Sequence, residues 1–223
     1  MLQALNPAAE WNQGERPFLR ADARLAIVLL TNEMDCSLYD YSIMEDSAYF
    51  GIHPDLQSPQ PSSAICWNAG VTCQGPDAFG VYTDCVPSEH EAMQPTQRYT
   101  SYLIEELRDS QGKEVVMLAI AGVPSGGPTA LETRDWRESD VLPEELEEGT
   151  VAAHKQWEFG IGPGCTAEVD VGTYIQALPP LRVREVCESL DTPDGGRRCC
   201  IESICNSDYA SAIDCLGELI DAP

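Results

Sequence analysis

The sequence predicts an α/β fold, namely an incomplete doubly wound parallel sheet with long disulfide-rich loop insertions. Two segments, residues 24–31 and 115–121, are almost entirely apolar, which is typical of parallel strands covered on both faces. An amphipathic segment lies between them, and strand, helix, strand is the parallel βαβ unit with its right-handed crossover. The 223 residues are enough for one sizeable domain, and we expect a single partial domain over residues 1–223.

The first predicted strand follows a short helical start and a loop. Residues 1–5 are typical of the last turn of an amphipathic helix, and residues 8–23 read as a loop. The strand at 24–31 then ends abruptly in the polar run TNEMD, residues 31–35. Folds of the α/β class place ligand sites at this end of a parallel strand, although an ordinary loop is the alternative interpretation.

Residues 37–95 read as a first insertion, rich in Pro, Gly, Ser, Asp and Tyr. The segment is too long for a simple connection in a compact domain. With Cys36 directly before it, it holds four cysteines, so we expect disulfides to pin it. Trp67, in the central motif SAICWNAGVTC, is either a binding residue or an aromatic side chain packed over a disulfide as a miniature core. We favour packing.

Regular structure resumes at Thr96. Apolar residues follow it at helical spacing, and this helix is expected to end near Gly112, directly before the second strand at 115–121. Residues 124–180 read as a second insertion, irregular and acidic. The segment LRVREVCESL, residues 181–190, fits a short strand or a helix equally well.

The end of the chain predicts a helix packed against the sheet. Ser207 is a good N-cap and Asp208 suits the first turn. One apolar stripe follows at helical spacing: Ala212, Ile213, Leu216, Leu219 and Ile220.

Acidic residues outnumber basic ones 37 to 13, which gives a formal net charge of −24. Such a surface repels phosphate backbones and anionic lipid surfaces, so we expect no nucleic-acid partner and no membrane partner. Solubility in a salty medium and calcium binding are the two explanations of the charge. No segment has the EF-hand spacing, and DTPDGG, residues 191–196, reads as a turn, so solubility is favoured.

An even number of cysteines in loop-like sequence predicts disulfides and an oxidising compartment. Zinc is the competing interpretation, but the sequence has no CxxC pair, and its three histidines are isolated from the cysteines and from each other. The candidates for disulfide bonds are all ten cysteines: Cys36, Cys66, Cys73, Cys85, Cys165, Cys187, Cys199, Cys200, Cys205 and Cys215.

An export signal should accompany these disulfides. The start, MLQALNPAAEW, has neither the basic beginning nor the continuous apolar core of such a signal. No stretch approaches the roughly 18 apolar residues that span a membrane. The cysteines are therefore either reduced and cytosolic, or the chain is the later part of a longer exported one. We prefer the second interpretation and expect an extracellular, periplasmic or cell-envelope location, without membrane insertion in this chain.

The order of the motifs resembles von Willebrand factor type A-like proteins, and more narrowly a cysteine-rich bacterial group of exported, often lipid-anchored members. The motifs are FLRADARLAIVLLTNEMDCS, SAICWNAGVTC, RYTSYLIEEL, VVMLAIAGVP and SICNSDYASAI. They cover most of the chain but correspond only to the second half of such a domain. The strand at 24–31 matches the fourth strand of the family, which lies between the first and the fifth. Because the first strand is missing here, we expect residues 25–31 to form an exposed edge.

The resemblance also implies a divalent cation at the strand ends, through which family members bind a partner protein or matrix. The family's Asp-x-Ser-x-Ser motif is absent, and Asn32 occupies the position of the Asp after the fourth strand. An amide contributes no charge to a hard cation, although Asp35 could compensate in part. We therefore expect a remnant metal site at Asn32 and Asp35, with weak or absent Mg²⁺ or Ca²⁺ binding and no other cofactor.

Together these observations predict a non-enzymatic, exported binding module with a degenerate or incomplete metal site and an unknown protein or matrix partner. A hydrolase is the rival from another class, but the sequence has no Gly-x-Ser-x-Gly and no phosphate loop. Ser125, in AGVPSGGP, lies among glycines after a strand, yet no helix pattern follows and a loop is favoured. A disulfide-rich structural protein of the cell envelope, without ligand binding, is the third hypothesis.

Overall fold

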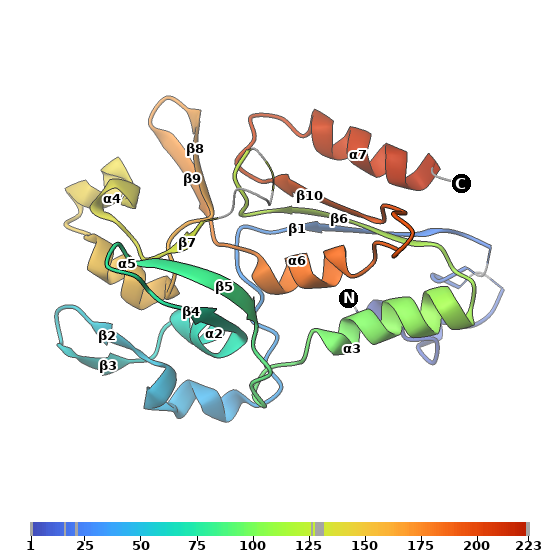
Figure 1. The fold of residues 1–223 in the computed structure, drawn as a ribbon, viewed down its shortest axis with the longest axis horizontal. Helices are drawn as coiled ribbons and strands as arrows, with labels where there is room; N and C mark the ends of the chain where they lie inside the picture. Colours follow the sequence, from blue (N-terminus) through green and yellow to red (C-terminus); the bar gives the residue numbers. More distant parts are fainter. Residues whose placement is uncertain (1, 16, 21, 126, 128–131, 222–223) are drawn as a thin grey trace.

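A three-stranded parallel sheet forms the centre of the computed structural model, which describes residues 2–15, 17–20, 22–125, 127 and 132–221. Figure 1 shows its strands in the order β1 (Leu25–Leu30), β6 (Val115–Ala121) and β10 (Cys199–Ser203). Both outer strands run parallel to β6, with Val28 and Cys200 opposite Leu118. The predicted α/β class with a parallel sheet is confirmed, and both predicted strands are part of it.

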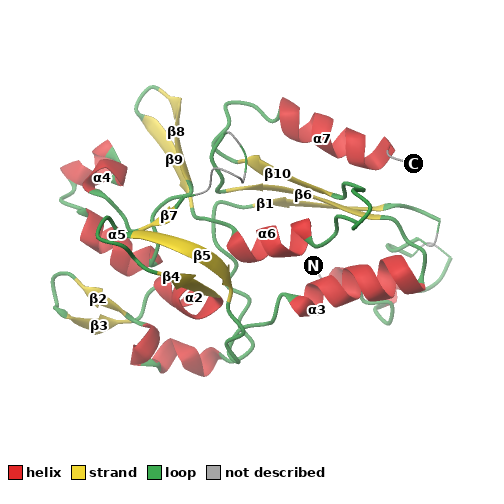
Figure 2. Cartoon of the chain, viewed as in Figure 1, coloured by secondary structure: helices red, strands yellow, loops and turns green. Residues whose placement is uncertain are grey.

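Helices cover both faces of this sheet (Figures 1 and 2). On one face lie α3 (Gln97–Thr100), its continuation as a π-helix (Ser101–Ser110) and α6 (Leu181–Glu188). On the opposite face α7 (Ala210–Asp221) packs on β6 and β10. Every residue of β6 is buried as a result, in agreement with its uninterrupted apolar sequence.

The edge strand β1 is covered on one face only. Leu25, Ile27 and Leu29 pack into the cluster beneath α3 and α6. On the face that carries α7, however, Val28 and Leu30 are 54% and 60% exposed. The prediction that this strand is covered on both faces is therefore wrong, because α7 packs on the other two strands. The prediction that it is an edge is confirmed within the described residues, where β6 is its one partner.

The two predicted insertions contain regular structure that their composition did not indicate, and most of it lies beside the sheet (Figure 1). Their strands form antiparallel pairs: β2 (Gly51–His53) with β3 (Ser58–Gln60), β4 (Val71–Gln74) with β5 (Val81–Pro87), β5 with β7 (Thr133–Arg134), and β8 (Cys165–Asp170) with β9 (Thr173–Ala177). Their α-helices are α2 (Ala64–Gly70), α4 (Pro143–Glu147) and α5 (Ala152–Phe159). Short 3₁₀ turns occur at Glu10–Asn12, Tyr41–Glu45, Ser47–Tyr49 and Glu138–Asp140.

Trp67 packs in the interior of this second region, as predicted. Its side chain is buried in a cluster with Trp136 and Ile161, and Cys73 packs against the same cluster. Since Cys73 is disulfide-bonded to Cys85, the interpretation of a miniature core over a disulfide is confirmed. Large aromatic side chains bury much apolar area each, which suits a small core of this kind.

All ten cysteines form disulfides, as predicted. The pairs are Cys36–Cys66, Cys73–Cys85, Cys165–Cys205, Cys187–Cys199 and Cys200–Cys215. Successive side chains of a strand point to opposite faces of a sheet. The adjacent cysteines of β10 therefore link it to α6 on one face and to α7 on the other.

Several shorter predictions have clear outcomes. The ambiguous segment 181–190 is helical, as α6. The last helix starts at Ala210, and Asp208 accepts a hydrogen bond from its backbone N–H at 3.0 Å, so Ser207 lies before the helix instead of capping it. Residues 191–196 form the expected turn, closed by the N–H of residue 192 and the carbonyl of residue 196. The N-terminal helix α1 spans Leu2–Leu5, and Met1 lies outside the described residues.

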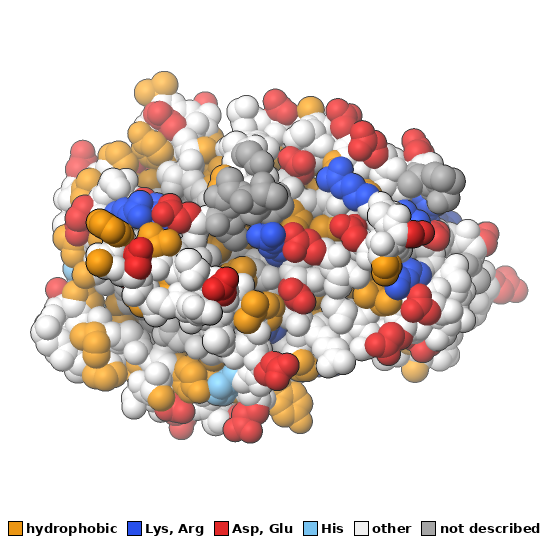
Figure 3. Space-filling view, in the orientation of Figure 1, with side chains coloured by type: hydrophobic (Ala, Val, Ile, Leu, Met, Phe, Trp, Pro, Cys, Tyr) orange, Lys and Arg blue, Asp and Glu red, His pale blue; other side chains and the backbone are white. Residues whose placement is uncertain are grey.

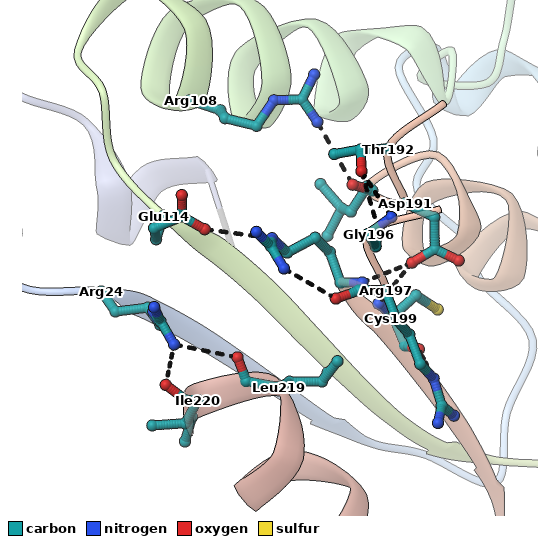
Figure 4. A network of polar contacts seen from close by, with 12 residues as sticks. Arg24, Arg108, Glu114, Asp191, Thr192, Gly196, Arg197, Cys199, Leu219 and Ile220 are labelled. Atoms are coloured by element: carbon teal, nitrogen blue, oxygen red, sulfur yellow. Dashed lines mark hydrogen bonds and ion pairs between the residues drawn. The ribbon is translucent and has the colours of Figure 1, made fainter. Parts of the chain in front are cut away.

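Charged side chains brace the end of the sheet where the strands begin (Figure 4). Arg198 forms an ion pair with Glu114 at 3.2 Å, and the carboxylate of Asp191 accepts backbone hydrogen bonds from Arg198 and Cys199. Arg24 donates to backbone carbonyls at the end of α7. The contacts of Arg198 and Asp191 join β10 to the start of β6 and to the turn after α6.

Candidate functional site

The open edge of β1 is the most distinctive surface of the sheet. The backbone N–H of Leu25 donates to Glu114 at 2.8 Å, and that of Thr31 donates to Ile120 at 3.0 Å, both toward β6. Because backbone groups alternate in direction along a strand, the N–H and C=O groups of Ala26, Val28 and Leu30 point away from the sheet. An extended peptide could pair with these groups as an additional strand.

Natural edge strands usually carry a charge, a proline or a bulge that discourages such pairing. None of these devices is present in β1, whose six residues are LAIVLL and whose pairing with β6 is regular throughout. The strand therefore combines outward-directed backbone groups with a fully apolar sequence.

The face of β1 on the side of α7 is apolar and exposed. Ala26 is exposed, and Val28 and Leu30 are 54% and 60% exposed. We call these three residues the apolar shelf. Of the apolar stripe predicted for α7, Ala212, Leu216 and Leu219 pack against the sheet, whereas Ile213 and Ile220 are 61% and 43% exposed and lie outside the packed face.

A pocket of ≈ 450 Å³ lies along the same strand and reaches its other face. We call it the edge pocket. Side chains of the sheet and of α6 make its apolar wall: Ile27, Val28, Leu29, Met117, Val183 and Val186. Its remaining lining residues are polar or aromatic: Asp35, Ser37, Thr96, Tyr99 and Arg182. A volume of this size, mainly apolar with a few convergent polar groups, is typical of ligand pockets.

Arg182 and Asp35 hold the polar end of the edge pocket together. The side chain of Arg182 is 3% exposed, and its Nε lies 2.8 Å from Oδ2 of Asp35. It also donates to the backbone carbonyls of Gly70 and Gln94. Asp35 in turn accepts a hydrogen bond from the hydroxyl of Ser37 at 2.5 Å. This ion pair fixes the loop after β1 to α6 and to the first insertion.

The two residues of the predicted remnant metal site have different surroundings. Asp35 uses one carboxylate oxygen for Arg182 and the other for Ser37. Asn32 is exposed, and its backbone carbonyl accepts a hydrogen bond from Leu178 at 2.9 Å. Within the described residues, no group of three or more His, Cys, Asp or Glu side chains is arranged to hold a metal ion. Weak or absent cation binding stays a prediction.

Sequence reasoning did not identify Arg182 or Tyr99 as residues of a site. The first of the two arginines in LRVREV looks like an ordinary surface residue, and no local signal shows that its partner is Asp35, 147 residues earlier. The histidines are also less isolated than expected. His53 of β2 and His154 of α5 lie edge to face with ring centroids 6.2 Å apart, and His154 contacts Asp55 at 3.1 Å.

Ser125, the superficial candidate for a nucleophile, is exposed in a turn after β6. Residues 126 and 128 of the same loop lie outside the described residues. Within the part of the chain that is described, the hydroxyl of Ser125 makes no hydrogen bond. A nucleophile needs an activating base within hydrogen-bond reach. That Ser125 is not a nucleophile stays a prediction.

Comparison with models of protein families, with curated proteins and with solved structures gives no match for this chain. None of the helices among the described residues is long and apolar enough to cross a membrane. The five disulfides fit an oxidising environment such as the extracellular space.

Proposed function

We propose that this protein is a non-enzymatic, exported binding module that takes up an extended segment of a partner protein along the edge of β1. The observation that carries the proposal is the open edge, whose outward-directed groups belong to Ala26, Val28 and Leu30. In strand addition, main-chain hydrogen bonds supply affinity, and pockets for alternate side chains supply specificity.

Both kinds of contact are available beside this edge. Side chains of an added strand would point alternately to the apolar shelf and to the side of the edge pocket. The shelf offers Val28 and Leu30, each more than half exposed. The pocket offers an apolar wall that ends at the buried ion pair of Asp35 and Arg182. A segment of apolar, β-branched residues could pack on the apolar shelf and on the apolar wall of the edge pocket.

The charge of the protein favours a basic or neutral partner over a second copy. The chain carries a net charge of −24, and Figure 3 shows acidic side chains spread over one face of the molecule. Complementary charge raises the association rate of two proteins, and like charge disfavours binding of a wrong partner. The preferred partner is therefore an extended apolar segment flanked by lysine or arginine.

We further propose that the chain corresponds to the later half of a von Willebrand factor type A-like domain with a degenerate metal site. Two observations support this. In doubly wound sheets the last three strands lie side by side in chain order, as β1, β6 and β10 do. The oxygens of Asp35 are already engaged by Arg182 and Ser37, so a cation would have to displace them. Partner binding in this proposal does not require Mg²⁺.

A synthetic peptide tests the strand-addition proposal. The peptide KKVIVIVKK has an apolar β-branched core with basic ends, and KKVPVPVKK carries the same charge but has prolines that remove backbone donors. We expect the first to bind with measurable heat by isothermal titration and to slow hydrogen exchange at the amides of Ala26, Val28 and Leu30. The second should do neither. Binding without protection of these amides, or equal binding of both peptides, would refute the proposal.

Matched lysine variants give a second test. Val28→Lys places a charge on the apolar shelf and should weaken binding of the first peptide by at least about tenfold, because edge lysines oppose strand pairing. Val171→Lys, at a fully exposed valine of the β8–β9 turn, should leave binding unchanged. Hydrolysis of an ester or peptide panel by the pure protein would instead favour the hydrolase hypothesis. Absence of any partner binding would favour the structural envelope protein.

A further inference from the structure

A second cavity, of ≈ 480 Å³, lies among the elements of the two insertions and shares no lining residue with the edge pocket. We call it the aromatic pocket. Elements α2, β2, β4, β5 and α5 supply its walls. Its lining consists of the aromatic residues Trp67, Tyr82 and Trp157, the amides Asn68 and Gln156, and small or aliphatic residues.

Internal contacts hold the aromatic walls in place. The indole N–H of Trp157 donates to the carbonyl of Gln60 at 3.2 Å, and its ring lies against His53 with centroids 4.4 Å apart. The hydroxyl of Tyr82 donates to Asp135 at 2.8 Å. Burial, together with this contact, raises the pKa of Tyr82 to about 12, so the phenol is neutral at physiological pH. The pocket is therefore pre-formed and does not need a ligand to assemble it.

Glycines bring its walls close together. Gly160 ends α5 with φ +77°, a left-handed conformation, and a Cβ there would lie 3.0 Å from the Cβ of Ala64 on α2. At Gly51 of β2 a Cβ would lie 3.2 Å from the indole of Trp157. Side chains at either position would push these elements apart, so the shape of the pocket depends on both glycines.

The lining contains no Asp, Glu, Lys, Arg or His, although the chain as a whole carries a net charge of −24. A charged ligand would find no opposite charge in this wall. Asn68 is exposed; its amide nitrogen donates to the carbonyl of Tyr49 at 2.9 Å, and within the described residues its side-chain oxygen accepts no hydrogen bond. The wall thus offers aromatic faces, which attract C–H groups, and an open acceptor for a hydroxyl.

We propose that the aromatic pocket binds a neutral saccharide unit, with the ring of the sugar stacked on the indole of Trp157 and a hydroxyl bonded to Asn68. A pyranose ring has both features that the wall requires, an apolar C–H face and hydroxyl donors at its rim. The volume of ≈ 480 Å³ is ample for one such ring. This proposal is independent of strand addition at β1, because the two sites have no residue in common.

Tryptophan fluorescence of the oxidised, full chain tests the proposal, since two of its four tryptophans line the pocket. The probes are the methyl glycosides of glucose, galactose, mannose and N-acetylglucosamine. We expect a saturable change with at least one of them in the millimolar range. Glucuronate, an anionic analogue of glucose, should bind at least about tenfold more weakly. No saturable change with any neutral glycoside, or an equal response to glucuronate, would overturn the proposal.

A blocking variant locates the binding. Ala153 is exposed on α5 and lines the pocket, so Ala153→Phe adds a ring at its mouth without removing an internal contact. It should weaken glycoside binding at least about tenfold. Ala210→Phe, at an exposed alanine of α7, is the matched control and should bind as the unaltered protein does. Both variants should melt within a few degrees of the unaltered protein. If Ala153→Phe is folded and binds the glycoside normally, the site is not this pocket.

Discussion

Replacing Asp35 with alanine should destabilise the protein strongly, because it leaves a buried cation without its counter-charge. The side chain of Arg182 is 3% exposed, and after the change the carbonyls of Gly70 and Gln94 are its remaining partners among the described residues. Removing one member of a buried pair costs about 3–5 kcal/mol. Since Asp35 itself is 24% exposed, water can reach Arg182 in part, and we expect about 3 kcal/mol. For a chain of this length, that loss lowers the melting temperature by about 6–12 °C.

The measurement is the free energy of unfolding from urea denaturation at pH 7 under non-reducing conditions. A double-mutant cycle with Arg182→Met separates the interaction from the cost of each truncation. The double variant should be less destabilised than the sum of the single variants by about 2 kcal/mol, because it leaves no unpaired charge.

The same helix supplies a matched control. Arg184 pairs with Glu188 at 2.7 Å, but their side chains are 29% and 44% exposed, so Glu188→Ala should cost about 0.5 kcal/mol or less. If Asp35→Ala costs no more than Glu188→Ala, then the pair with Arg182 does not fix the loop after β1. In that case the carboxylate of Asp35 would also not be held away from a metal ion.

Three further predictions follow from the same structure. Titration with Mg²⁺ or Ca²⁺ should show no specific heat and no rise in melting temperature, and Asn32→Asp should restore little; a one-to-one micromolar site lost in Asp35→Ala would contradict this. Thiol titration in denaturant should find essentially no free thiol before reduction and close to ten after it, whereas ten beforehand would refute the oxidising location. Burial acts to raise the pKa of Asp140, but the hydrogen bonds from the Arg134 side chain and the Arg137 backbone, together with the positive charges of both arginines, hold it below its usual value. Its stabilising contribution is present above the unfolded value of about 3.9 and is lost as the pH falls through the folded value. Asp140→Asn should therefore be less stable than the unaltered protein at pH 7, and the difference should shrink on acidification toward pH 2; a constant difference would contradict the assignment.

The sequence predicts two of the three strands of the sheet and misses β10, and the apolar pattern of the two predicted strands does not by itself distinguish the centre of the sheet from its edge. Both β1 and β6 are apolar at nearly every position, and a hydrophobic pattern records only that a side chain is suited to burial. It does not say what covers that side chain. In β6 the cover is α7 and the helices of the opposite face, whereas in β1 one face has no cover among the described residues.

Helix α5 and the aromatic pocket could not be predicted, for a different reason. The eight residues AAHKQWEF bury only Ala152 fully, so they show no continuous apolar stripe. The partners of this helix come from distant parts of the chain, as when the carbonyl of Trp157 accepts a hydrogen bond from Ser62, 95 residues earlier. Local periodicity carries no information about such contacts. The adjacent cysteines 199 and 200 did carry a readable signal, because neighbouring side chains of a strand must find partners on opposite faces.

The charge of the protein and its open edge are best understood together. An apolar edge strand without lysine, proline or a bulge normally invites pairing with another copy of the same chain. Here every copy carries a net charge of −24, so two copies repel each other as they approach within the screening length of about 8 Å at physiological salt. A neutral or basic segment meets no such barrier. In most proteins, residues of the edge strand itself prevent pairing with a second copy, whereas here the negative charge of the whole surface does so. The N–H and C=O groups of Ala26, Val28 and Leu30 therefore remain free for a partner of different charge.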